Sequence, residues 1–131
     1  MGIDVEHDRP LDDLEELVRA SLTAEEAARV SGVAECRRRR EFLRCWTAKE
    51  AALKAHGLGL EIPPRNAAIR FGRDDRPVAV DIVDASATAR YRAMVLDPFG
   101  PSDAIVAVAG NGFSELRLAL VGADARIFMM E

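Results

Sequence analysis

The sequence lacks several features that would direct it to particular classes of protein. Its 131 residues include only two cysteines, Cys36 and Cys45, and both fall in one predicted helix whose geometry does not let them bridge, so we expect reduced thiols. No apolar run approaches the roughly 20 residues that span a bilayer, which excludes a membrane protein. The 18 basic and 22 acidic residues give a formal net charge of −4, which argues against a nucleic-acid-binding protein. The first residues are acidic where a secretory leader would be basic, so we expect a cytoplasmic protein.

The chain is expected to form one domain over residues 1–131, because 49% hydrophobic residues suffice for a single core. Apolar periodicity predicts a short strand over Ile3–Glu6 and amphipathic helices over residues 10–22, 23–30 and 34–56. Thr23 and a glutamate three residues later resemble a capping box. Strands are predicted at 67–71, 77–83, 89–96 and 105–109, with further strands at 115–121 and 125–129. The fold class is therefore α+β, an antiparallel sheet packed against the long helix.

On a helical wheel, Glu50 falls between the apolar residues Leu43 and Trp46 of the long helix. A carboxylate on a buried stripe loses hydration unless a cation or hydrogen bonds replace it. Lys54 lies one turn further on, at the edge of the same stripe. An exposed ion pair between Glu50 and Lys54 is the alternative interpretation, and the flanking apolar residues weigh against it.

Asp4 and Glu6 alternate with apolar residues in the first strand, so both carboxylates point the same way. Together with Glu50 they would offer the oxygen ligands that Mg²⁺ prefers alongside phosphate oxygens. The pattern Asp-x-Glu is common by chance, and an exposed strand end is the alternative. The combination with an inward-facing glutamate, followed one turn later by lysine, strengthens the metal-site interpretation.

Two segments resemble the signatures of the 4′-phosphopantetheinyl transferases. They are Gly2-Ile3-Asp4-Val5-Glu6 and, about 40 residues later, Trp46-Thr47-Ala48-Lys49-Glu50-Ala51-Ala52-Leu53-Lys54-Ala55-His56-Gly57-Leu58-Gly59-Leu60. The two segments agree with the family in residue type, spacing and order. The tryptophan resembles the second half of the surfactin-synthetase-activating type rather than the short holo-acyl-carrier-protein synthase type.

The resemblance implies Mg²⁺-dependent transfer of the 4′-phosphopantetheine arm of coenzyme A to a serine of an apo acyl or peptidyl carrier protein. Asp4, Glu6 and Glu50 would hold Mg²⁺, and Glu50 would also take the proton from the carrier serine. Lys54 would contact phosphate and assist the departing oxygen. Lys49 would contact phosphate or pack its stem over the sheet, and Gly57 would let backbone approach the coenzyme or simply cap the helix.

The sequence departs from the family in one respect. The Ser-x-Ser-His segment that supplies a histidine for the coenzyme is missing, and the two histidines present, His7 and His56, lie in other contexts. His7 beside the metal motif could substitute, but a surface histidine is the simpler interpretation. A fragment of a longer enzyme, a chain completed by a homo-oligomer or partner lobe, and a diverged homologue are three explanations. The alternative function is a non-catalytic homologue that binds a carrier protein or a partner half.

Four consecutive arginines, residues 37–40, open the long helix. Because they wrap around the helix, at most two can address one partner, and a solvated face is the simpler interpretation. The functional interpretation assigns Arg37 and Arg38 to docking of an acidic carrier protein or of coenzyme A phosphates. Glu25 aligns with an acidic residue of the family, and we interpret it first as structural.

Overall fold

The fold is known from a computed structural model, which describes residues 1–57, 61–85, 87–97, 103–112, 115–121 and 124–130. The described elements follow the chain in the order β1 (Gly2–His7), α1 (Leu14–Ser21), α2 (Ala24–Gly32), α3 (Glu35–His56), a 3-10 turn (Pro64–Asn66), β2 (Ala67–Phe71), β3 (Pro77–Asp84), β4 (Ala87–Leu96), β5 (Ala104–Gly110), β6 (Glu115–Val121) and β7 (Asp124–Met130). Two predicted loops, at 58–60 and 98–101, lie outside these residues.

The main sheet has five antiparallel strands in the order β1-β5-β4-β3-β2. Strands β2 to β5 are neighbours in the sheet in the same order as in the sequence, as the short turns between them predict. Strand β1 instead pairs with β5, from Gly2 opposite Ala109 to His7 opposite Ala104. This pairing joins the start of the chain to its last third, and it sets the first predicted motif beside the long helix.

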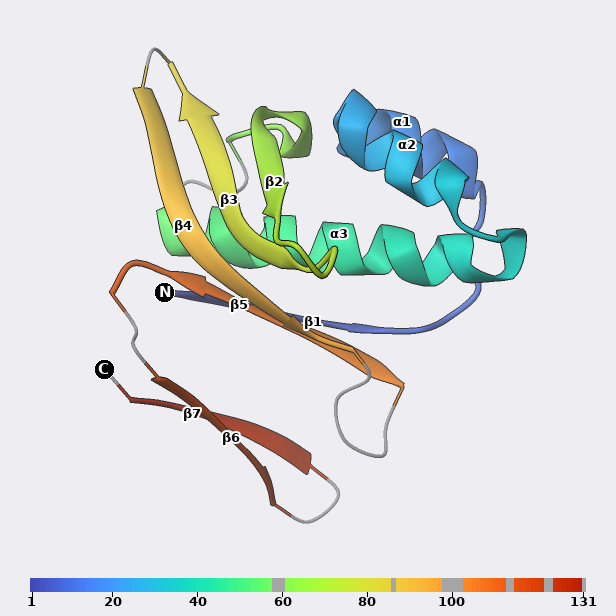
Figure 1. Ribbon diagram of the computed structural model, residues 1–131. Coiled ribbons are helices and arrows are strands. Elements are labelled where there is room, and N and C mark those ends of the chain that lie inside the picture. Colours follow the sequence, from blue (N-terminus) through green and yellow to red (C-terminus); the bar gives the residue numbers. More distant parts are fainter. Residues whose placement is uncertain (58–60, 86, 98–102, 113–114, 122–123, 131) are drawn as a thin grey trace.

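Helix α3 lies across one face of this sheet, as Figure 1 shows, with α1 and α2 beside it. The core between helix and sheet is apolar, and small alanines in α3 allow close packing against the strands. The α+β arrangement expected from the sequence is confirmed. In the described part of the chain, no helix combines the length and the apolar character that crossing a membrane requires.

Helix ends follow capping chemistry. Asp13, at φ 51°, accepts a hydrogen bond from the Glu16 amide, so α1 begins at Leu14 and not at the predicted residue 10. The capping box is present at α2, where Thr23 and Glu26 bond each other's backbone amides. Gly57 ends α3 with φ 84°, in the left-handed region that favours glycine.

The two C-terminal strands predicted at 115–121 and 125–129 are present as β6 and β7. They pair with each other, from Glu115 opposite Met130 to Val121 opposite Asp124, in a separate two-stranded sheet. Figure 1 shows this hairpin away from α3. The tail therefore adds strands without extending the main sheet.

Candidate active site

Strand β1 brings the first motif against α3. Gly2 and Asp4 are buried, whereas Ile3, Val5 and His7 are exposed, so the alternation predicted for this strand is confirmed. Only a glycine fits at position 2, because a Cβ there would lie 2.5 Å from the Ala55 nitrogen. The close approach holds Asp4, which is 7% exposed, against the helix.

Helix α3 supplies the opposing side chains. The ammonium of Lys54 donates to Asp4 Oδ1 at 2.7 Å and to the Ile3 carbonyl at 3.2 Å. About two helical turns earlier, Trp46 Nε1 donates to Glu6 Oε1 at 3.3 Å. These contacts lie 40 or more residues apart in sequence and join the two predicted motifs at one edge of the sheet.

The carboxylates of this cluster repel one another. Burial raises the pKa of Asp4 above its usual range, with a further rise from Glu6, although the Lys54 ammonium works in the opposite direction. Burial also raises the pKa of Glu50, and the negative charges of Asp4 and Glu6 add to that rise. Glu50 is half-buried near both acids of β1. In the parts of the chain that the structure describes, the three carboxylates face only two cations, Lys54 and Arg9, so a net negative charge remains here.

The donor set suits a hard divalent cation. Asp4 Oδ2 is buried and has no hydrogen-bond partner. A cation bound at this oxygen would satisfy it. Among the described side chains, however, no three of the histidine, cysteine, aspartate or glutamate type are already gathered closely enough to hold a metal ion. The acids influence one another's pKa without converging, and Lys54 takes the other oxygen of Asp4. The residues fit a cation by chemistry and by the unsatisfied oxygen.

Lys49 does not face this cluster, which corrects its assignment as a phosphate-binding residue. Its side chain is 0% exposed, and its ammonium donates to Glu26 Oε1 at 2.5 Å and to the Ser21 carbonyl at 2.8 Å. Burial lowers the pKa of Lys49, whereas the Glu26 carboxylate opposes that change. A buried ammonium held in this way cannot reach a phosphate at the surface.

Sequence reasoning found Glu26 as part of the capping box and missed its contact with Lys49. We singled out its neighbour Glu25 as the counterpart of the acidic residue in the family, but Glu25 is exposed and Glu26 is 1% exposed. Two signals could have found it. Glu26 is the third residue of the capped helix, and the wheel angle of Lys49 turns that lysine inward, so a buried acid was required.

The arginines that open α3 are largely engaged within the chain. Arg38 donates to the carbonyls of Ser31 and Val33 at the end of α2, so it closes that helix and its assignment to partner binding is not supported by its contacts. Arg39 and Arg40 share the Asp8 carboxylate at 2.7 and 3.0 Å. These two arginines are therefore engaged within the chain.

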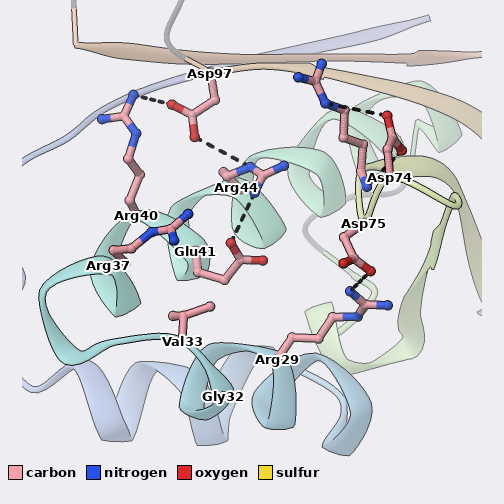
Figure 2. Close-up of a pocket in the computed structure, with 11 residues that line it drawn as sticks. Arg29, Gly32, Val33, Arg37, Arg40, Glu41, Arg44, Asp74, Asp75 and Asp97 are labelled. Carbon is pink, nitrogen blue, oxygen red and sulfur yellow. Dashed lines mark hydrogen bonds and ion pairs between the residues drawn. The ribbon is translucent and has the colours of Figure 1, made fainter.

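Arg37 is exposed and lines a polar pocket of about 680 Å³ between α2, α3, the β2–β3 turn and the end of β4. Figure 2 shows that Arg40 and Arg44 both point at Asp97, and Arg44 also reaches Glu41 at 3.1 Å. Most of the charged side chains around this pocket are thus already paired with one another. It lies apart from the cluster of Asp4 and Lys54, and it does not contain the predicted site.

The remaining candidates have structural roles. The Gly57 amide donates to the Leu53 and Lys54 carbonyls, which is the helix cap that was one of its two interpretations. His7 is exposed on the far face of β1. His56 contacts the Tyr91 hydroxyl at 2.8 Å and the Asp84 carboxylate at 3.2 Å, away from the acidic cluster.

Both cysteines are free thiols, as expected. Cys36 is exposed, and burial raises the pKa of the Cys45 thiol to about 12, so that thiol stays protonated in the core. Neither cysteine contributes to the acidic cluster.

Comparisons with known proteins agree with the fold. The crystal structure of a holo-(acyl-carrier-protein) synthase from Bacillus anthracis strain Ames, in complex with CoA (3′,5′-ADP), is similar to this chain with a TM-score of 0.61 and 20% identity. The match covers 82% of this chain and 91% of that chain, and at this identity it shows a shared fold. No curated protein matches the sequence. A family model matches residues 1–109, and the chain therefore belongs to the 4′-phosphopantetheinyl transferase superfamily.

Proposed function

We propose that this protein transfers the 4′-phosphopantetheine group of coenzyme A to a serine of an acyl or peptidyl carrier protein. The observation that carries the proposal is the meeting of Asp4, Glu6 and Lys54 of the two family motifs at one edge of the sheet, with Glu50 beside them. The related fold of a synthase in complex with CoA (3′,5′-ADP) supports the choice of coenzyme A as co-substrate.

The reaction joins the serine oxygen to the β-phosphorus of coenzyme A and breaks that atom's bond to the bridging oxygen, which leaves as 3′,5′-adenosine bisphosphate. Glu50 accepts the proton of the serine hydroxyl, because a half-buried carboxylate with a raised pKa is a suitable general base. Lys54, which is half-exposed and held by Asp4, offers its ammonium to the oxygen that departs.

Asp4, Glu6 and Glu50 are the residues that would hold Mg²⁺. When bound, Mg²⁺ would supply positive charge that neutralises the pyrophosphate and these three carboxylates. The unpartnered Oδ2 of Asp4 and the raised pKa of both Asp4 and Glu50 support this assignment. Trp46 donates its indole hydrogen to Glu6 Oε1, and Arg9 pairs with Glu6 Oε2 at 3.0 Å, so Mg²⁺ would take the place of Arg9 at Glu6.

A second lobe or a second copy is proposed to complete the site. Ile3 and Val5 of β1 and Met94 of β4 are exposed on the sheet face away from α3. Ile3 and Met94 both lie opposite Val108 of β5, which is itself fully buried, so the exposed apolar side chains stand on either side of a covered strand. Exposed apolar side chains grouped on one face are typical of surfaces that another polypeptide covers.

Arg37 is the arginine of the predicted pair that is exposed at the start of α3, and we assign the docking of an acidic carrier to it. Binding through an exposed arginine is sensitive to salt and changes the association rate more than the chemistry. Arg37→Ala is expected to raise KM for the carrier and to leave kcat unchanged.

The non-catalytic alternative is favoured by one observation. Of the two histidines in the sequence, His7 is exposed on the far face of β1 and His56 is engaged with Tyr91 and Asp84. A chain acting alone would therefore lack a histidine beside coenzyme A.

The experiment incubates the protein with fluorescent coenzyme A, an apo carrier protein and Mg²⁺, and follows label transfer and carrier mass. We expect transfer by the wild type and none by Glu50→Gln, whereas Glu25→Gln, an exposed glutamate on α2, transfers at the wild-type rate. Carrier binding without any transfer by the wild type would favour the non-catalytic function.

A further inference from the structure

A buried ion pair joins four elements directly beside the proposed base. Lys49 precedes Glu50 in α3, and its ammonium donates to Glu26 Oε1 at 2.5 Å with both side chains almost completely buried. The same ammonium donates to the carbonyl of Ser21 at the end of α1. The Ile69 amide of β2 donates to Glu26 Oε2 at 2.9 Å. Helices α1, α2 and α3 and strand β2 therefore meet at one charged node.

Stability alone does not account for this node. Removing two charges from water costs several kcal/mol each, and apolar side chains of similar volume often replace such pairs without loss of stability. The remaining core around α3 is apolar and close-packed. A charged pair nevertheless gives directional contacts that an apolar contact does not, because each hydrogen bond requires a defined position of its donor and acceptor.

These directional contacts restrict the rotation of α3 about its axis and its sliding along that axis. Successive residues of a helix differ by about 100°, so fixing the direction of Lys49 also fixes the direction of Glu50. The Lys49 ammonium is bound on one side to a helix capping residue and on another to a backbone carbonyl, so a turn of α3 would leave a buried charge without its partner. The opposite side of α3 carries Lys54 and its contact with Asp4.

We propose that Glu26 and Lys49 are positioning residues that hold Glu50 in its catalytic direction toward β1. The inference rests on the proposed function, because it assigns to this pair a role in the chemistry of Glu50. Glu26 and Lys49 contact neither substrate, and they act through the orientation of α3.

The test compares Lys49→Met, Glu26→Gln and the double variant. Each single variant leaves one buried group without its partner, so its urea midpoint is expected to fall. The double variant removes both charges while keeping similar volumes, and its midpoint is expected to return toward the wild-type value. If the ion pair between Lys49 and Glu26 only stabilised the fold, the double variant would then have wild-type activity. The positioning role predicts instead a kcat lower by about tenfold to a hundredfold, with KM for coenzyme A within about twofold.

A second readout does not depend on transfer. Mn²⁺ serves as a paramagnetic probe, and its affinity, measured by the loss of free-ion signal, is expected to fall about tenfold in the double variant. The matched control is Arg29→Met with Asp75→Asn, which removes an exposed ion pair between α2 and the β2–β3 turn and is expected to change neither kcat nor Mn²⁺ affinity.

The outcomes separate the two proposals. A folded double variant with wild-type kcat and Mn²⁺ affinity overturns the positioning role, while inactive Glu50→Gln in the same assay leaves the proposed function standing. A wild type that neither transfers the label nor binds Mn²⁺ overturns the proposed function, and the positioning inference with it.

Discussion

Replacement of Gly2 by alanine tests the contact that brings the two motifs together. The added Cβ would lie 2.5 Å from the Ala55 nitrogen and closer still to the Ala51 carbonyl oxygen. Both neighbours are backbone atoms of α3, so no side-chain rotation relieves the clash, and β1 must retreat by roughly 1.5 Å to reach ordinary contact distances. Overpacking of this kind costs about 3 kcal/mol of unfolding free energy.

The retreat of β1 also moves Asp4 away from Lys54, whose contact is 2.7 Å. We expect transfer to fall about 100-fold, because catalysis is sensitive to displacements of this size. Urea unfolding followed by the fluorescence of Trp46, the single tryptophan, measures the stability.

Gly32→Ala is the matched control for Gly2→Ala. Gly32 ends α2, and a Cβ there would have no atom within 4 Å. Its unfolding free energy is expected to stay within about 1 kcal/mol of the wild type. If Gly2→Ala were as stable and as active as Gly32→Ala, the close approach of β1 to α3 would be refuted.

Two further predictions concern pH. Arg90 and, to a lesser degree, Arg70 lower the pKa of Asp81 to about 2, so its charge stabilises the folded protein above pH 4. Asp81→Asn is expected to lose about 1 kcal/mol at pH 7, and in urea titrations the difference from wild type should disappear as the pH falls from about 4 to about 2; a constant difference would exclude the ion pair as its cause. Glu50→Gln is expected to raise the unfolding free energy by roughly 0.5–2 kcal/mol in EDTA at pH 7. Burial and the charges of Asp4 and Glu6 raise the pKa of Glu50, so protonation stabilises the wild type and the gain should shrink as the pH falls through that raised pKa; a loss of stability at pH 7 would contradict this account.

Local chemistry predicted most elements of the fold. The β2 bounds and the end of α3 at Gly57 agree with the prediction, because turn residues and a left-handed glycine act within a few residues of the chain. The predicted start of α1 at Pro10 was wrong because Asp13 caps the helix. Boundaries of this kind depend on a single side-chain contact.

The sequence by itself selected the residues of the proposed site, since Asp4, Glu6, Glu50 and Lys54 occur in two motifs whose order and spacing are specific. Only the tertiary structure decided which residue faces which. It pairs β1 with β5, joins Asp4 to Lys54, and turns Lys49 away from the site onto Glu26. Periodicity gives the direction of a side chain relative to its own helix, whereas a partner 23 or 50 residues away is chosen by packing across the core.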